Sequence, residues 1–366
     1  MTHRVLIDSR MADAAGIGTY IVNLVPLVAA ALPTVAFTLL GKPERLASLG
    51  LLNPPNVRAV RYERRLYGPA EWLGPSIGQP VDLLWVPHFN TPLFGGGKLL
   101  VTVHDTFHLA MPHLMTNRPQ AAYARLRYRL MRARADRIIT VSEFSRSELV
   151  RLLGVERERI EVIPLGVDAS WRHQSSVEHD AKPYIVFVGS LKPHKNVGTL
   201  IEAFRRIADR IPHDLVIIGG EDGMLTADDV LLRSKDRLGG RVRFLGRLDK
   251  PDLIERVCGA DALVHPSLYE GFGLTPVEAM ACGCPTVVSS AASLPEVCGD
   301  ASLYFDPRSP SELAATLLRL LTDSDLRDVL ITRGRVRAGG YDWHNTAQRT
   351  ASVIQSMLPA QSMGVA

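Results

Sequence analysis

One stretch, residues 261–288, constrains the fold of this chain more than any other. Ala262–Val264 is a short apolar run of the kind that forms a buried parallel strand. Gly271 and Gly273 follow it, and glycines so placed allow a turn whose backbone approaches a ligand closely. A strand that passes through such a turn into a helix is the repeating unit of a doubly wound α/β domain.

A helix start follows the glycine turn. Thr275 and Glu278 have the T-x-x-E spacing of a capping box, and Pro276 suits the first position of a helix. Amides at a helix start and the positive end of its dipole favour a phosphate, and the carboxylates of Glu270 and Glu278 flank this anion site. The spacing alone leaves a plainer interpretation open, in which Glu278 closes the capping box and Glu270 is an ordinary loop acid.

The sequence from Glu270 to Val287, E-G-F-G-L-T-P-V-E-A-M-A-C-G-C-P-T-V, resembles the E-x7-E motif of the retaining GT-B enzymes in glycosyltransferase family 4, also called glycosyltransferase group 1. The match is long and ungapped, and the resemblance covers most of the chain, most strongly residues 136–305. It implies an α/β fold of two Rossmann-like doubly wound domains that face each other across a cleft. It also implies a C-terminal helix that crosses back to the first domain.

The length of 366 residues exceeds what one hydrophobic core usually supports, so we expect two domains. A polar stretch at residues 169–182 separates two series of strand and helix patterns. We therefore place an N-terminal Rossmann-like, acceptor-binding domain at residues 1–168. A C-terminal Rossmann-like, nucleotide-sugar-binding domain is expected at residues 169–343, and a crossover helix with a tail at residues 344–366.

Composition indicates the class of protein and its compartment. Hydrophobic residues make up 46% of the chain and charged residues 22%, which is typical of a globular rather than a disordered protein. The apolar run at residues 24–40 is short for a membrane span, and the chain passes from Met1 directly into a strand at Val5–Ile7. We therefore expect a cytoplasmic protein with neither a transmembrane segment nor a signal peptide.

The cysteines agree with a reducing compartment. They lack the spacing of zinc ligands, which favours buried thiols. The four are Cys258, Cys282, Cys284 and Cys298.

Charge is unevenly distributed along the chain. The net charge is +4, yet residues 1–165 carry 20 Lys and Arg against 13 Asp and Glu. Many of these arginines lie in a helix expected at residues 119–137, which a solvated basic helix explains. The alternative is peripheral contact with anionic lipid on the inner face of the cell membrane, or with a polyprenyl-phosphate acceptor. Nucleic acid is not an expected partner, because no recognised binding module is present.

Glycines and histidines mark the expected site in the first domain. Gly16 and Gly18 follow the first strand and open a helix, but the third glycine of the dinucleotide fingerprint is missing. This favours a looser phosphate-facing loop or a simple tight turn. His104 ends a strand, where open α/β sheets place ligand-binding residues. The resemblance implies that the glycine loop reaches the donor diphosphate and the acceptor and that His104 faces the donor sugar, with His88 as a second candidate.

The second domain repeats the pattern. Ser190 and Lys195 follow the strand at residues 184–188, and a lysine at a helix start suits a diphosphate, although a solvated lysine is the plainer alternative. The resemblance implies a basic pair that clamps the diphosphate. Lys195 matches its second member, whereas Ser190 occupies the place of the first, so Lys192 is a candidate replacement. Phe244 lies in a segment similar to the one that the family places against the nucleotide base.

The resemblance implies a division of roles around the donor. Glu270 and His104 would contact the transferred sugar as catalytic residues, and Glu278 would hold the ribose hydroxyls. With a lysine and helix dipoles stabilising the leaving diphosphate, no metal is required, and the D-x-D at residues 323–325 is explained as a helix cap. The donor-binding set is Gly16, Gly18, Ser190, Lys195, Phe244, Phe272, Gly273, Leu274 and Glu278.

We therefore predict a retaining, metal-independent hexosyltransferase that moves a hexose from a nucleotide-sugar to a glycan or lipid-linked acceptor in surface polysaccharide synthesis. On the resemblance, V-H-D at residues 103–105 with G-S-x-x-P-x-K-N at residues 189–196 favours GDP-mannose as the donor, and no other cofactor is expected. Two alternatives remain. One is a GT-B nucleotide-sugar epimerase, and the other is a catalytically silent glycosyltransferase-like partner subunit, which the serine at position 190 favours.

Overall fold

The computed structural model describes residues 3–14, 16–64, 66, 72–75, 78–94, 96–115, 118–172, 182–220, 238 and 240–359. Contacts between residues divide the chain into two compact units. Unit 1 combines Met1–Gly166 with Asp342–Ala366, and unit 2 is Val167–Tyr341. Each unit contains a parallel sheet with helices packed against it, so the chain has the paired Rossmann-like α/β architecture that the sequence predicts.

Unit 1 contains a seven-stranded parallel sheet with the order β3-β2-β1-β4-β5-β6-β7. Its strands are β1 (Arg4–Asp8), β2 (Ala36–Gly41), β3 (Val57–Arg61), β4 (Leu83–Val86), β5 (Lys98–Val103), β6 (Arg137–Thr140) and β7 (Ile160–Val162). Its helices are α1 (Ile17–Ala31), α2 (Pro43–Ser48), α3 (Phe107–Ala110), α4 (Arg118–Arg134), α5 (Glu143–Leu153) and α13 (Trp343–Met357).

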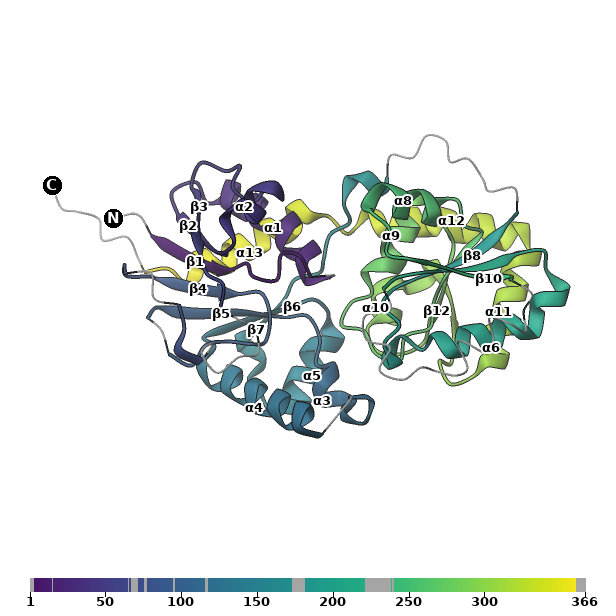
Figure 1. Ribbon diagram of the computed structural model, residues 1–366, viewed down its shortest axis with the longest axis horizontal. Coiled ribbons are helices and arrows are strands. Elements are labelled where there is room, and N and C mark those ends of the chain that lie inside the picture. The colour runs from purple at the N-terminus through teal and green to yellow at the C-terminus, as the bar shows by residue number, and fades with distance from the viewer. Residues whose placement is uncertain are drawn as a thin grey trace. The chain divides into compact units, whose positions relative to one another are not determined.

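The central strands of unit 1 are apolar because helices cover both faces of the sheet. Figure 1 shows α1 and α13 along one face and α4 and α5 along the other. Val86, Val101 and Ile138 are fully buried, as expected for central parallel strands. The C-terminal helix α13 packs on α1, and the Thr346 hydroxyl donates a 2.8 Å hydrogen bond to the carbonyl of Pro164. The last helix thus belongs to the first unit, as the sequence predicts.

Unit 2 contains a six-stranded parallel sheet with the order β10-β9-β8-β11-β12-β13. Its strands are β8 (Tyr184–Val188), β9 (Asp214–Ile218), β10 (Val242–Gly246), β11 (Ala262–His265), β12 (Thr286–Ser289) and β13 (Ser302–Phe305). Its helices are α6 (Val197–Ile207), α8 (Lys250–Cys258), α9 (Leu274–Cys282), α10 (Leu294–Cys298), α11 (Pro310–Thr322) and α12 (Ser324–Gly339).

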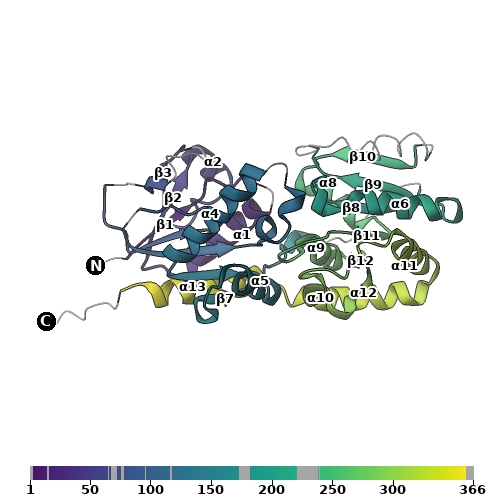
Figure 2. The same ribbon diagram turned by 90° about the horizontal axis from the view of Figure 1, so that it is seen from below.

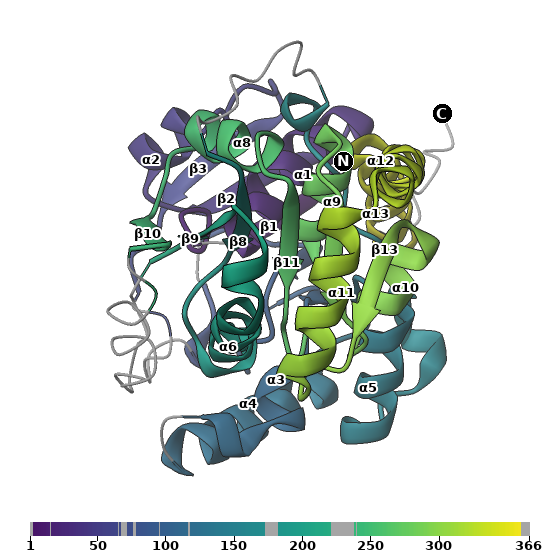
Figure 3. The ribbon, with the colours of Figure 1, turned by 90° about the vertical axis from the view of Figure 1, so that its right-hand side faces the viewer.

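Helices also pack in pairs against the sheet of unit 2. Figure 3 shows α6 and α11 together in front of the strands, and Figure 2 shows α9, α10 and α12 gathered on one side of the sheet. The apolar faces of α6 and α11 enclose a core with Phe187, Phe204 and Leu317 at its centre. This core holds the carboxyl ends of β8 and β11 in fixed positions.

Both sheets reverse their strand order at one point, between β1 and β4 in unit 1 and between β8 and β11 in unit 2. The connections from the two strands beside such a point run to opposite faces of the sheet, which leaves room for a ligand between the loops that follow these strands. In unit 2 these loops are residues 189–196 after β8 and residues 266–273 after β11. These loops carry Lys195 and Glu270, so the fold brings together residues that are 75 positions apart in the sequence.

The start of α9 differs from the prediction. The helix begins at Leu274 with Gly273 as its N-cap, so Thr275 lies inside the first turn and the expected T-x-x-E capping box does not form. Gly273 has a φ of 94°, and a Cβ there would lie 2.5 Å from Cδ2 of Leu294. A glycine cap therefore replaces the predicted threonine cap, because only glycine fits this backbone and this space.

The arginine-rich helix also needs a correction. Helix α4 ends at Arg134, and Arg137 lies on β6 instead. Arg127 is buried, although a solvated face was expected, and its guanidinium donates to Asn90 Oδ1 and to the carbonyl of Thr91, both at 2.6 Å. The expected cap is confirmed at Asp323, which accepts a hydrogen bond from the amide of Leu326.

The cysteines are less uniformly buried than expected. Cys284 and Cys298 are buried, whereas Cys258 and Cys282 are half-buried, and all four are free thiols. Among the residues that the structure describes, no helix combines the length and apolar character needed to cross a membrane.

Candidate functional site

Hydrogen bonds between the two loops at the switch point of unit 2 hold them together. Asn196 adopts the left-handed conformation, with a φ of 57°, and its side-chain amide donates to the carbonyls of Pro266 and Pro307. The amide of Leu268 donates to the carbonyl of His194 at 2.7 Å. The loop that follows β8 and the loop that follows β11 are therefore coupled, and a movement of one would displace side chains on the other.

Two side chains converge on the carboxylate of Glu270. The Lys195 ammonium lies 2.6 Å from Oε1 of Glu270, and Nε2 of His265 lies 2.8 Å from the same oxygen. Burial alone would raise the pKa of the Glu270 carboxyl, but the Lys195 charge and the hydrogen bond from His265 outweigh burial and hold this pKa well below its usual value. Glu270 is therefore an ionised carboxylate with a cation at its side.

The amino end of α9 offers backbone amides at the same edge of the sheet. The first turn of α9 contains no acidic residue, and the amides of Leu274 and Thr275 have no hydrogen-bond partner among the described residues. The Ser293 hydroxyl lies 3.0 Å from the carbonyls of both Glu270 and Phe272 and so holds this loop from below. Free amides at a helix start, beside a lysine, are the arrangement that binds an anion.

Glu278 lies one turn into α9. Partial burial raises the pKa of its carboxyl to about 7, although Lys250 and a hydrogen bond from the Trp171 side chain act in the opposite direction. Lys250 is itself paired with Asp168 at 2.8 Å, so it offers Glu278 only part of its charge. The carboxyl is therefore poorly stabilised in its ionised form and would gain from hydroxyl donors.

The remaining predicted residues of unit 2 are Ser190, Phe244 and Phe272, which are placed by the elements that carry them. Ser190 lies two residues beyond β8, in the same loop as Lys195. Phe244 is half-buried on the edge strand β10. The buried ring of Phe272 packs edge-on against Tyr341, with ring centroids 5.3 Å apart.

In unit 1, the predicted glycines lie at the start of α1. Gly16 is the N-cap, with a φ of 71°, and no side chain caps the helix. A Cβ on Gly18 would lie 2.5 Å from the carbonyl oxygen of Ala12, so glycine is needed there for a close backbone approach. The tight-turn interpretation thus explains Gly18, while the uncapped helix start at Gly16 leaves room for an anion.

His104 lies directly after β5. Its Nε2 is 3.2 Å from the carbonyl of Pro87 and must donate to it, so Nδ1 is the free acceptor, with no partner among the described residues. Burial lowers the pKa of His104 to about 4, and the ring is therefore neutral at pH 7. A neutral ring with an open Nδ1 can accept a hydrogen bond from a hydroxyl group.

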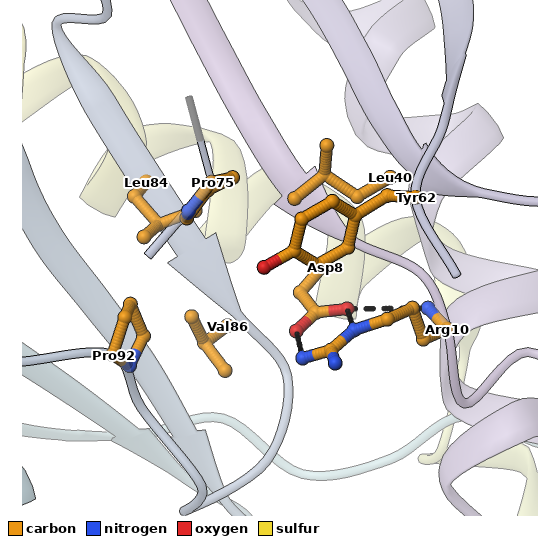
Figure 4. Close-up of a pocket in the computed structure, with 8 residues that line it drawn as sticks. All are labelled: Asp8, Arg10, Leu40, Tyr62, Pro75, Leu84, Val86 and Pro92. Carbon is orange, nitrogen blue, oxygen red and sulfur yellow. Dashed lines mark hydrogen bonds and ion pairs between the residues drawn. The ribbon is translucent and has the colours of Figure 1, made fainter. Parts of the chain in front are cut away.

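Unit 1 also contains a buried ionic cluster that the sequence did not predict. Asp8 at the end of β1 pairs with the Arg10 guanidinium, and Nε2 of His88 lies 3.3 Å from Oδ2 of Asp8. Figure 4 shows Asp8 and Arg10 beside the Tyr62 ring, in a small hollow with apolar walls that include Leu84. The second histidine candidate is thus engaged with Asp8.

The structure brings Lys195 and Glu270 into contact in unit 2, whereas Gly16, Gly18 and His104 lie in unit 1. Sequence reasoning missed His265, which is the last residue of β11, much as His104 directly follows β5, and which could have been found by the same rule. It also missed Trp171 and Lys250 beside Glu278, because nothing in their local sequence indicates that they lie near α9.

The fold places the chain in a class of proteins. It resembles the sucrose-phosphate synthase from Thermosynechococcus elongatus, with a TM-score of 0.76, 22% identity and coverage of 97% of this chain and 99% of that one. It equally resembles Anabaena Alr3699/HepE in complex with UDP and glucose, with a TM-score of 0.76, 20% identity and coverage of 97% and 100%. At these identities the similarity shows the fold alone, which is that of a GT-B glycosyltransferase.

Family models identify the chain more closely. The model for glycosyltransferase family 4 matches residues 14–171, and the model for glycosyl transferases group 1 matches residues 170–337. The chain belongs to this family of glycosyltransferases. The O-antigen chain mannosyltransferase B of Escherichia coli is 34% identical over 234 residues, which are 60% of this chain and 61% of that protein.

The raised pKa of Glu278 makes a prediction about stability. An ionised Glu278 is unfavourable in the folded protein, so the free energy of unfolding should fall as pH rises from the ordinary pKa of 4.5 to about 7. Glu278→Gln removes this fall. We expect the variant to match the wild type near pH 4.5 and to exceed it by about 1–2 kcal/mol at pH 8, as measured by urea unfolding at both pH values.

Glu202→Gln is the control for this experiment. Glu202 is exposed enough to be solvated and its pKa is lowered by the neighbouring Arg205, so its substitution should not stabilise the protein at pH 8. Equal stability of wild type and Glu278→Gln at both pH values would contradict the expected raised pKa.

Proposed function

We propose that this protein is a retaining, metal-independent hexosyltransferase that transfers mannose from GDP-mannose to a glycan or lipid-linked acceptor in surface polysaccharide synthesis. The observation that carries the proposal is the Lys195–Glu270 pair beside the start of α9, which no side chain caps. This edge of the sheet combines a cation, free amides and a carboxylate. These are the groups that a sugar joined to a diphosphate needs.

The leaving diphosphate is the centre of the proposed chemistry. Cleavage of the anomeric bond leaves its electron pair on a phosphate oxygen, so fixed positive charge there stabilises the transition state. Lys195 uses one of its three N–H donors on Glu270, and two remain for phosphate oxygens. The amides of Leu274 and Thr275 add two more donors at the positive end of a helix dipole.

Carboxylates suit the hydroxyl groups of the donor. Glu278 would accept from both ribose hydroxyls, and these donors would stabilise a carboxylate that is otherwise close to protonation at pH 7. Glu270 would accept from a hydroxyl of the transferred sugar, and the neutral His104 would accept from another through Nδ1. Ser190 fills the first clamp position with an uncharged hydroxyl, so Lys195 is the principal cation.

The relatives support the choice of donor and pathway to different degrees. The E. coli relative is named a mannosyltransferase of the O-antigen chain, which favours mannose and a surface polysaccharide. The Anabaena structure contains UDP and glucose, so UDP-glucose is the donor to test beside GDP-mannose. A cytoplasmic location is part of this proposal.

Isothermal titration with GDP, UDP, dTDP and ADP tests the site. We expect one diphosphate to bind with an affinity that EDTA does not change. Lys195→Ala and Glu278→Ala should each weaken this binding by about tenfold or more, because each removes a charge-assisted contact to the ligand.

Lys192→Ala tests whether Lys192 serves as the missing clamp residue. Lys192 lies three residues before Lys195 and is exposed, so a change in affinity below about threefold excludes that role, and a loss of about tenfold or more assigns it. Absence of binding by all four diphosphates would favour the silent-subunit alternative. Release of free diphosphate that does not depend on an acceptor would favour the epimerase alternative.

Retention has its own test. We propose that the acceptor hydroxyl attacks the face that the diphosphate leaves and gives its proton to the departing phosphate oxygen, with no covalent intermediate on the protein. The product should have the same anomeric configuration as the donor, as read by NMR immediately after transfer. An inverted product would refute this mechanism.

We also propose that α4 contacts an anionic membrane surface. Arg125, Leu126 and Arg129 share an exposed face of this helix, and its sequence contains no acidic residue. Among the described residues, neither Arg125 nor Arg129 has an ion-pair partner. Arginines without ion-pair partners beside the exposed Leu126 suit the interface of an anionic bilayer.

Co-sedimentation with vesicles tests this contact. Vesicles that contain phosphatidylglycerol should bind the protein, and vesicles of phosphatidylcholine alone should bind it weakly. The double variant Arg125→Gln/Arg129→Gln should lose about tenfold or more in affinity. Arg205→Gln/Arg206→Gln removes the same charge from α6, where both arginines pair with Glu202, and should bind like the wild type. Equal binding to both kinds of vesicle would contradict the proposal.

A further inference from the structure

We propose that His265 is a positioning residue, which holds one oxygen of Glu270 and thereby presents the other oxygen to a hydroxyl of the donor sugar. The inference rests on the proposed function of this site. It assigns to His265 a role in reading the sugar, as distinct from the nucleotide.

The two oxygens of Glu270 have different surroundings. Oε1 lies 2.8 Å from Nε2 of His265 and 2.6 Å from the Lys195 ammonium, so its lone pairs are used by protein donors. Oε2 has no hydrogen-bond partner among the described residues and is not among the buried polar atoms that lack one. The carboxylate is therefore anchored through one oxygen and open at the other.

The histidine is itself held in one state. It is buried, and burial lowers its pKa despite the neighbouring carboxylate, so the ring is neutral at pH 7. A carboxylate oxygen can only accept, and the single ring proton must therefore lie on Nε2. Nδ1 is buried without a partner, which would make a second proton there unfavourable. Ser267, with its hydroxyl 3.2 Å from Nε2, adds a second polar contact to the same ring nitrogen.

Lys195 does not provide this orientation. An ammonium on a flexible four-carbon chain is a point charge with rotating donors, and it attracts a carboxylate without fixing its plane. An imidazole that is packed at the end of β11 has one N–H in one direction. The cation therefore keeps Glu270 ionised, and the histidine determines which way the carboxylate faces. When a ligand engages the remaining donors of Lys195, His265 is the contact that keeps Oε1 in place.

This division has a consequence for recognition. Oε2 of Glu270 is ionised, open and fixed in direction, so it needs a hydrogen-bond donor. A sugar without a hydroxyl at that place leaves the carboxylate charge without a hydrogen bond. Sites built in this way reject the analogue that lacks the group. The nucleoside diphosphate has no such hydroxyl, and its affinity should not depend on the orientation of Glu270.

A purely structural role is the alternative, and unit 2 contains a matched case of it. His213 is also buried, its Nε2 lies 3.3 Å from Oδ2 of Asp261, and its Nδ1 also lacks a partner. His213 precedes β9 and Asp261 precedes β11, so this pair lies at the amino ends of strands, away from the loops that follow β8 and β11. The same substitution at positions 265 and 213 therefore separates stability from recognition.

Calorimetry with two ligands tests the proposal. The wild type is titrated with GDP and with GDP-mannose, or with the nucleotide and nucleotide-sugar pair that the wild type selects. His265→Leu should weaken the nucleotide-sugar by about tenfold and leave the diphosphate within about twofold, and hydrolysis of the nucleotide-sugar should fall as well. His265→Gln, whose side-chain amide reaches the place of Nε2, should restore most of the affinity. His213→Leu should leave both affinities unchanged.

His265→Asn guards against misfolding of the leucine variant. Its amide reaches only the place of Nδ1, so it keeps a polar side chain but loses the contact with Glu270, and it should behave like His265→Leu. An equal loss for both ligands, or no loss for either, would overturn the proposal. Absence of binding by the wild type would instead contradict the proposed function.

Discussion

The ion pair between Lys195 and Glu270 can form only when the sheet of unit 2 has folded, and the proposed chemistry depends on this ion pair. Its members come from loops on the two sides of a switch point, so their contact requires the strand order of the sheet. The loops are joined by Asn196 and by a backbone hydrogen bond between Leu268 and His194. A partly buried pair of charges is favourable only when its geometry is maintained, because either charge alone would be poorly solvated. The surrounding hydrogen bonds maintain it.

The sequence predicted the features that depend on local pattern. Apolar runs and glycine turns located the strands on either side of the site, and Asp323 was correctly identified as a helix cap. The failures arose where tertiary packing overrides local preference. Gly273 replaces Thr275 as the cap of α9 because Leu294 leaves no space for a side chain there. Arg127 is buried because Asn90 and the carbonyl of Thr91, some 36 positions away, accept hydrogen bonds from its guanidinium. Nothing in the adjacent sequence indicates such partners.

The carboxylates of unit 2 illustrate how burial acts in two directions. Glu270 is surrounded by donors and is ionised, whereas Glu278 has only partial compensation from Lys250 and the Trp171 side chain, and its pKa rises to about 7. Two residues of one motif, eight positions apart, thus have opposite shifts. In a site whose hydrogen bonds were all made before the ligand bound, a buried carboxyl would not need a raised pKa like that of Glu278. The raised pKa indicates that the second carboxylate lacks donors that a ligand would supply.

The return of α13 to unit 1 has a consequence for the order in which the chain folds. Ile354 and Met357 of α13 are buried in unit 1, and Trp343 packs on Gly166 and near Tyr20. During synthesis, all of unit 2 leaves the ribosome before these residues do, so unit 2 can complete its core while unit 1 still exposes the apolar surface of α1. The first unit to be translated is the last to be finished. Until then it is the part of the nascent chain most in need of a chaperone.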